Sequence, residues 1–190
     1  PFLCTDYEWT DPTTMVIHMR DDAYFSDGDR VQAEDVNYSF WMNAQGMMAS
    51  YYGCIDYEAS EISDDGLTLT WHFTQEYGPF ESLMDTPQIV NMSAVGNLAS
   101  DEPSWWDQPI GSGPYEVVEN IAGSHATYRL REDYWKEDFV PQWDEIIVNY
   151  YSEPTAMFIA FENGELDVVC SVSANDAARL ANGQTQLGDR

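Results

Sequence analysis

Two segments alternate apolar and polar residues with the period of a β-strand. The first runs from Thr14 to Arg20, and the second is LTLTWHFT at 67–74. Alternation of this kind is typical of a strand with one face toward a core and the other toward solvent. We therefore expect two strands whose buried faces carry Met15, Ile17, Met19, Leu67, Leu69, Trp71 and Phe73.

Between these segments the pattern changes to a helical period. The stretch AEDVNYSFWMNAQ begins at Ala33, just after a turn signal at Asp27-Gly28. Acidic residues in its first turn suit the positive end of a helix. The apolar side of the predicted helix carries Val36, Phe40, Trp41 and Met47.

The second half of the chain predicts a short helix opened by Pro79, then a polar connector over residues 97–108. YEVVEN and ATYRLRE, joined by IAGS, predict a hairpin, and EIIVNYY predicts a further strand. A helix from Pro154 to Gly164 and a strand at LDVV, 166–169, then complete a strand–helix–strand unit.

Composition indicates a folded protein with a strongly acidic surface. The 190 residues are 44% hydrophobic and 14% aromatic, whereas disordered acidic chains are poor in both kinds of residue. Against 34 Asp and Glu stand seven Lys and Arg, for a net charge of −27. Such a surface repels nucleic-acid phosphates and anionic membranes, so we expect neither as a partner. No segment is long and apolar enough to span a membrane.

The three cysteines are Cys4, Cys54 and Cys170, and they show neither a disulfide framework nor a zinc-site spacing. We expect buried free thiols. A Cys4–Cys54 bridge remains an alternative, because sequence does not give the distance between the two residues.

The stretch PIGSGPYEVV, at 109–118, places two glycines before an apolar run, as a phosphate-binding loop does. Three features exclude that interpretation. Pro114 lacks an N–H group, Glu116 would repel phosphate, and a strand follows instead of a helix. The sequence therefore predicts a structural turn.

Other candidate chemistry is weak. His18, His72 and His125 lack a metal-site spacing, so we expect solvated or hydrogen-bonded rings. Acidic pairs such as Asp21-Asp22 and Asp64-Asp65 lie in turns, where Asp is common. The aromatic pairs Tyr51-Tyr52 and Trp105-Trp106 suit either a ligand groove or packing between subdomains.

Five short motifs occur in series along the chain: F-x-D-G at 25–28, AEDV at 33–36, GSGPY at 111–115, YW at 134–135 and GELD at 164–167. Their types and order resemble the family 5 extracytoplasmic solute-binding proteins, which deliver oligopeptides, dipeptides or nickel complexes to ABC importers. Departures are mild. Ser112 replaces the usual Thr, Gln32 stands at the helix cap, and Arg131-Glu132-Asp133 replaces an Arg-Asn stretch.

The resemblance implies an α/β fold, mixed α+β over this chain, of the periplasmic-binding-protein-like type II. It implies part of lobe I: an outer subdomain at 1–98, part of the core subdomain at 99–170, and at 171–190 the start of a segment toward lobe II. Family members are several hundred residues long and bind ligand between two lobes. The absence of lobe II is expected to leave an apolar edge exposed.

The implied function is non-enzymatic capture of a peptide or related small solute, delivered to a membrane permease. The full-length protein is expected to be a monomer and extracytoplasmic, as an anchored lipoprotein. No cofactor or metal is implied. By approximate position, Tyr51, Tyr52 and Gln88 are the expected ligand contacts. The alternatives are a carboxylate- or metal-dependent extracellular hydrolase and a sensory relative of the same fold.

Overall fold

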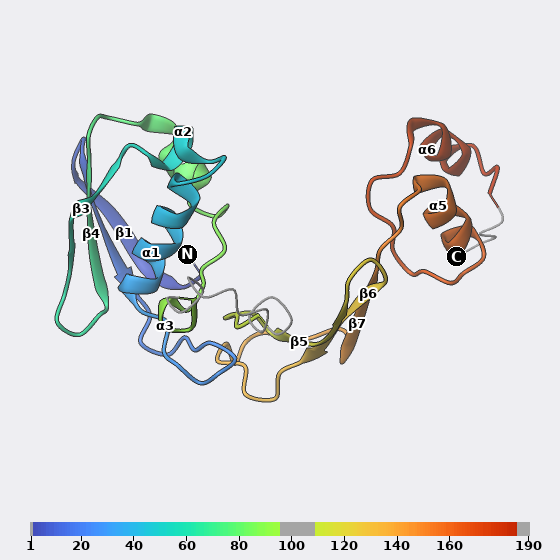
Figure 1. Cartoon of the computed structure of the whole chain (residues 1–190), viewed down its shortest axis with the longest axis horizontal. Helices are drawn as coiled ribbons and strands as arrows, with labels where there is room; N and C mark the ends of the chain where they lie inside the picture. The colour runs from blue at the N-terminus through green and yellow to red at the C-terminus, as the bar shows by residue number, and fades with distance from the viewer. Residues whose placement is uncertain (1, 96–108, 186–190) are drawn as a thin grey trace. The chain divides into compact units, whose positions relative to one another are not determined.

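A computed structural model describes residues 2–95 and 109–185, and the chain divides into two compact units (Figure 1). The first unit comprises the residues up to 119 and 128–146, and the second comprises 120–127 and 147–190. The connector predicted at 97–108, with Trp105-Trp106, lies outside the described residues. The subdomain boundaries expected from the resemblance stay predictions.

A four-stranded antiparallel sheet organises the first unit. Its order is β1-β2-β4-β3, with β1 at Cys4–Asp11, β2 at Thr14–Met19, β3 at Ile55–Ile62 and β4 at Thr68–Phe73. Met15 lies opposite Trp71 in the register of the two central strands. Both predicted strands are thus confirmed, and so are their buried faces except at Leu67, which precedes β4 and is only partly buried. The two outer strands were not predicted.

Helix α1 (Ala33–Ala44) covers one face of this sheet, as Figure 1 shows, and contacts β3 and β4. Beside it lies a 3-10 helix, η1 (Gly78–Leu83), with Pro79 in its first turn as predicted. Phe80 of η1 is fully buried and packs against five aromatic rings: Trp9, Phe40, Tyr52, Trp71 and Phe73. The core is therefore an aromatic layer between sheet and helices.

The apolar side predicted for the first helix extends too far. Helix α1 ends at Ala44, with Gln45 as its C-cap and a turn at Gly46. Met47 lies in that turn and is 99% exposed, and Trp41 of α1 is 41% exposed, so of the predicted apolar side only Val36 and Phe40 are buried. Two single-turn helices complete this region, α2 at Ala49–Tyr52 and α3 at Met92–Val95.

A second sheet has the order β5-β6-β7, with β5 at Tyr115–Ile121, β6 at His125–Leu130 and β7 at Glu145–Asn149. The predicted hairpin is confirmed, and Gly123 in its turn has φ 73°, a conformation that favours glycine. Helix α5 (Pro154–Glu162) ends before Gly164, as expected, and α6 spans Ala174–Ala181.

The strand predicted at 166–169 is wrong, and with it the strand–helix–strand unit. These residues form no strand, and Val168 is 73% exposed. A strand needs a neighbour for its N–H and C=O groups, and no strand of the described residues pairs with this segment.

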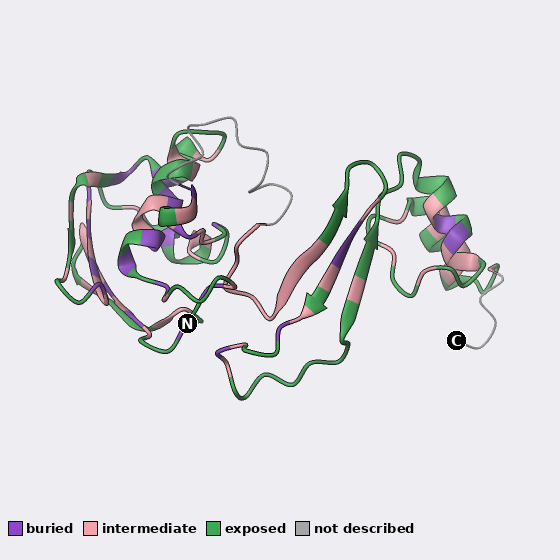
Figure 2. Cartoon of the chain, turned by 60° about the horizontal axis from the view of Figure 1, so that its bottom comes forward, coloured by how far each residue is buried: buried purple, intermediate pink, exposed green. Residues whose placement is uncertain are grey.

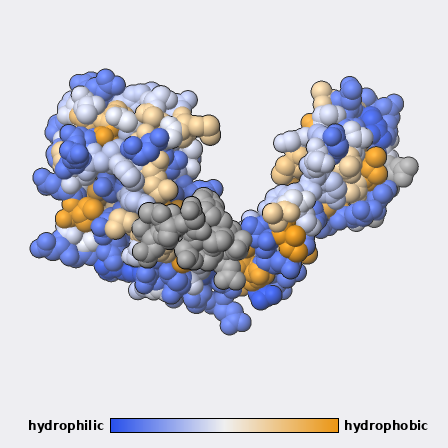
Figure 3. Space-filling model, viewed as in Figure 1, coloured by the Kyte–Doolittle hydropathy of each residue, from blue (hydrophilic) through white to orange (hydrophobic). Residues whose placement is uncertain are grey.

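The cysteines are free thiols in this structure: Cys54 is buried, Cys4 is half-buried and Cys170 is exposed. The prediction of burial was wrong for Cys170, which lies in a bend between α5 and α6. No helix among the described residues is long and apolar enough to cross a bilayer. On the face drawn in Figure 3, hydrophilic residues predominate and apolar residues form separate patches.

Candidate functional site

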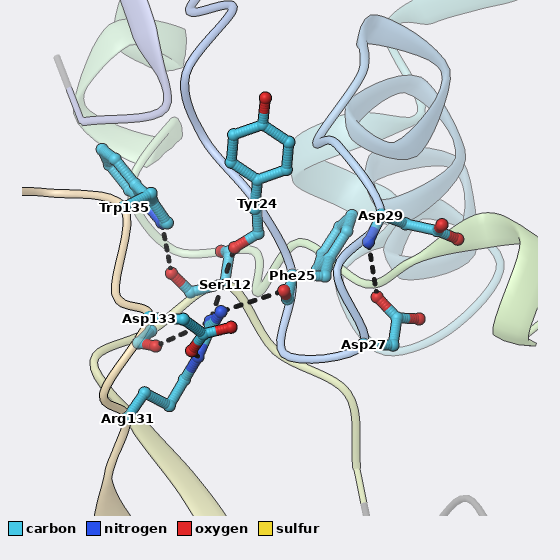
Figure 4. A network of polar contacts seen from close by, with 9 residues as sticks. Tyr24, Phe25, Asp27, Asp29, Ser112, Arg131, Asp133 and Trp135 are labelled. Carbon is cyan, nitrogen blue, oxygen red and sulfur yellow. Dashed lines mark hydrogen bonds and ion pairs between the residues drawn. The ribbon is translucent and has the colours of Figure 1, made fainter.

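The glycine-rich turn at 111–114 offers backbone carbonyls to the rest of the first unit. Gly111 O accepts from Ser26 N at 2.9 Å, and Ser112 O accepts from Trp135 Nε1 at 2.9 Å (Figure 4). Pro114 O accepts from the backbone N of Arg131 at 2.9 Å. A phosphate loop would need N–H groups aimed at an anion, so this arrangement supports the prediction of a structural turn.

Arg131 makes hydrogen bonds both to that turn and to the F-x-D-G loop. Its side chain is nearly inaccessible, and its guanidinium donates to Phe25 O at 3.0 Å, Gly113 O at 3.3 Å and Tyr24 O at 3.4 Å. It also pairs with Asp133 at 3.1 Å, and this hydrogen bond holds the pKa of the Asp133 carboxyl below its usual range. Carbonyl oxygens and one carboxylate thus satisfy the buried cation.

The F-x-D-G loop is itself a tight turn. Gly28 has φ 91°, and the Asp27 carboxylate accepts from the backbone N of Asp29 at 3.0 Å. The Asn91 amide donates to both carboxylates, at 2.9 Å to Asp27 and at 3.1 Å to Asp29. Neutral N–H donors thus satisfy both carboxylates of the loop.

Asp35, in the AEDV motif, is a buried residue in the first turn of α1, and its side chain accepts a hydrogen bond from the backbone of the N-cap residue Gln32. Its carboxylate accepts from the backbone N–H of Gln32 and of Met92, both at 2.8 Å. Burial raises the pKa of Asp35 above its ordinary value, although these two hydrogen bonds oppose that effect. Asp35 therefore joins the start of α1 to the segment at Met92 through structural contacts.

His18 and His72 lie on the strands where the pattern placed them, and His125 is the first residue of β6. His72 Nδ1 is 3.3 Å from Thr14 Oγ1, His18 Nε2 is 3.8 Å from Asp6, and His125 Nδ1 is 3.0 Å from Ser124 Oγ. Within residues 2–95 and 109–185, no three His, Cys, Asp or Glu side chains are grouped closely enough to hold a metal ion.

The three expected ligand contacts have different environments. Tyr51 is 40% exposed and Gln88 is exposed. Tyr52 is fully buried, and its hydroxyl donates to Leu83 O at 3.0 Å. The Tyr52 ring therefore joins α2 to η1, whereas Tyr51 and Gln88 have surface available to a ligand.

The first unit also contains an apolar cavity of about 470 Å³ that sequence reasoning missed. Its walls come from β1 and the two residues before it, from β2, β4 and α1, and from η1 with the segment that follows it. No sequence signal marks it, because most wall residues read as ordinary core positions and the polar ones, Glu81, Ser82 and Asp85, as ordinary surface positions. The residues that line it are Phe2, Leu3, Cys4, Tyr7, Ile17, Met19, Val36, Phe40, Trp71, Glu81, Ser82, Met84, Asp85, Pro87 and Ile89.

Known proteins with similar structures bind small solutes. The chain superposes on a protein from Agrobacterium tumefaciens solved with mannopinic acid, MoaA, with a TM-score of 0.79 and 21% identity over 96% of this chain and 37% of that one. For NikZ from Campylobacter jejuni, solved with Ni(L-His), the TM-score is 0.75 at 21% identity, covering 88% and 34%. At such identities the likeness shows the fold, and it confirms the expected mixed α/β binding-protein fold.

Sequence comparison agrees. A probable peptide-binding protein of Agrobacterium fabrum, YejA, is 27% identical over 173 residues, which are 78% of this chain and 26% of that protein. A putative ABC transporter peptide-binding protein of Brucella ovis is 26% identical over 168 residues, or 84% and 31%. The chain thus spans about a quarter to a third of the length of these relatives.

The family model of the bacterial extracellular solute-binding proteins, family 5, matches residues 1–187, nearly the whole chain. This match covers all five motifs from which the resemblance was inferred. The chain belongs to the family 5 bacterial extracellular solute-binding proteins.

Proposed function

We propose that the protein is the extracytoplasmic solute-binding component of an ABC importer, which captures a peptide or related small solute and delivers it to a membrane permease. The observation that carries the proposal is the family match over residues 1–187. Relatives named as ABC transporter peptide-binding proteins support it. It concerns the whole protein, of which this chain corresponds to a part.

The action proposed is binding without chemistry. A ligand that binds the closed state more tightly than the open one shifts the population toward closure, and no bond need change. The motif side chains Asp27 and Asp35 are occupied by backbone or amide donors, and the nearby Arg131 is occupied by backbone carbonyls and the Asp133 carboxylate. No observation on the described residues supports the hydrolase alternative.

Tyr51 and Gln88 are our proposed ligand contacts in this part of the protein. An exposed tyrosine offers an apolar ring and a polar hydroxyl, and an exposed glutamine offers a donor and an acceptor. Tyr52 supports them, because its buried hydroxyl bond fixes the short helix that carries Tyr51. We further propose that the full-length protein is a lipid-anchored monomer and that the chain forms part of lobe I.

The test uses the natural full-length protein and a set of defined dipeptides and oligopeptides. A peptide at about 100 times its Kd stabilises the folded state by about 2.7 kcal/mol, which a thermal shift detects. Tyr51→Ala and Gln88→Ala are expected to reduce the shift. Tyr24→Ala is the matched control, since Tyr24 is also 40% exposed.

The proposal fails if no peptide or other small solute stabilises the full-length protein. The residue assignment fails separately if Tyr24→Ala reduces the shift as much as Tyr51→Ala does. Recovery of cleaved peptide would favour the hydrolase instead.

A further inference from the structure

We propose that the apolar cavity of the first unit is a second binding site, for an organic cation that joins an apolar body to an ammonium group. This site goes beyond the proposed peptide site, because neither Tyr51 nor Gln88 lines it. Its volume of about 470 Å³ lies within the range of about 300–1,000 Å³ typical of small-molecule sites.

The inner wall of the cavity is rigid and apolar. Ile17 and Met19 come from β2, Trp71 from β4, and Val36 and Phe40 from α1. All five belong to the hydrophobic core and are at most 7% exposed. This wall is apolar throughout, and Met19 and Val36, at 6% and 7% exposed, are its most accessible members.

The outer wall is more accessible. Met84 and Ile89 follow η1 and are partly buried, whereas Phe2 is 49% exposed and Tyr7 is 36% exposed. A ligand can therefore reach the cavity past aromatic side chains, and such rings also attract cations at their faces.

Charge selects the class of ligand. The charged side chains that line the cavity are Glu81 and Asp85, both exposed, and no Lys, Arg or His lines it. Glu81 is held in place by the indole of Trp9, whose Nε1 donates to Glu81 Oε1 at 2.8 Å. Among the described residues no ion pair holds the Asp85 carboxylate.

An apolar body with a carboxylate would bring like charges together at this opening, which is unfavourable. A neutral apolar molecule would gain only the burial of its surface. An ammonium group beside Asp85 would add an ion pair, so a cationic ligand fits this lining best.

The test follows the methyl groups of methionines labelled with carbon-13 in this 190-residue chain. Met19 and Met84 line the cavity, and Met47, 99% exposed, is an internal reference. The probes are octylammonium, octanol, octanoate and ethylammonium. We expect octylammonium to shift the Met19 and Met84 signals and to bind about fivefold more tightly than octanol.

Two variants separate the site from the general acidity of the surface. Asp85→Asn is expected to remove the preference for octylammonium over octanol. Asp64→Asn, which removes an exposed carboxylate outside the cavity lining, is expected to retain it. Met84→Trp narrows the cavity and is expected to weaken both probes, with far-UV circular dichroism confirming the fold.

The inference is overturned if octanoate binds as tightly as octylammonium, or if no probe moves Met19 and Met84. Equal effects of Asp64→Asn and Asp85→Asn, or binding of ethylammonium equal to that of octylammonium, would show nonspecific attraction to the surface and also overturn it. Failure here leaves the peptide-binding proposal intact, because that test uses the full-length protein and different residues.

Discussion

The two units use their apolar residues differently. In the first, residues from β2, β4, α1 and η1 form one continuous core around Phe80. In the second, Phe158 and Ala160 of α5 are buried, but Ile147, Ile159 and Val168 are 54%, 51% and 73% exposed. Figure 2 shows the contrast between buried positions along α1 and mostly exposed ones along β7.

The difference teaches that the sequence pattern determines whether a segment forms a strand or a helix. Burial of its apolar face also requires another element to pack against that face. Strand β4 and helix α5 were both predicted from their residues. The inner face of β4 meets α1 and η1, so every apolar side chain on it is covered. Helix α5 is just as apolar, yet among the described residues only part of its surface is covered.

The largest expected effect comes from breaking the aromatic core. Phe80→Ala removes a fully buried ring with five aromatic neighbours, and we expect a loss of about 3–5 kcal/mol in the free energy of unfolding. Tryptophan fluorescence during urea unfolding measures this, because the five tryptophans among the described residues all belong to the first unit.

The matched control is Phe158→Ala in the second unit. Phe158 is also buried, but its described ring contacts are with Phe161 and the Arg179 guanidinium. We expect its fluorescence midpoint to equal that of the wild type. A loss as large as for Phe80→Ala would show that the two units unfold as one.

The next effect concerns the junction of the motifs. Arg131→Met removes the guanidinium that donates hydrogen bonds to Phe25 O and Gly113 O. We expect a loss of about 3 kcal/mol in the free energy of unfolding, measured in the same assay. Asp133→Asn is the control. Asp133 is 70% exposed at its side chain, so its replacement is expected to cost less than about 1 kcal/mol. Equal losses would mean that the surface ion pair, not the carbonyl contacts, holds the junction.

Surface charge gives a smaller effect that both units share. With a net charge of −27, carboxylates repel one another. Within the described ranges, local ion pairs already hold Arg20, Arg131, Lys136 and Arg179. Raising NaCl from about 0.05 M to about 1 M shortens the Debye length to about 3 Å, so we expect Tm to rise. An equal osmolality of glycerol separates screening from general solute effects. A fall in Tm with salt would contradict this.

The smallest effect is the titration of Asp35. Because burial raises its pKa in the folded state, that state binds more protons than the unfolded one between the two pKa values. The free energy of unfolding therefore falls as pH rises through that range, which begins at the ordinary Asp pKa of 3.8. We expect wild type and Asp35→Asn to differ in the slope of stability against pH there. Parallel curves would show that Asp35 keeps an ordinary pKa.

The sequence predicted the strands and helices in which apolar residues recur at a regular spacing. It missed the elements that lack such a spacing and the features that depend on packing in the fold. Strands β1 and β3 are acidic and mostly exposed, so they show no alternation to recognise. Tyr51 and Tyr52 are neighbours in one short helix, and it is the contacts of the Tyr52 ring with Phe40 and Phe80 in the fold that bury Tyr52 and not Tyr51. The cavity escaped prediction for the same reason, since its walls come together only in the fold.

The most direct test of the central claim, that this family member binds a solute and does not transform it, is calorimetric titration of the natural full-length protein with a peptide, followed by mass spectrometry of the recovered peptide. The account predicts saturable binding and a peptide of unchanged mass. Absence of saturable binding of any peptide or related solute, or recovery of hydrolysed peptide, would contradict it.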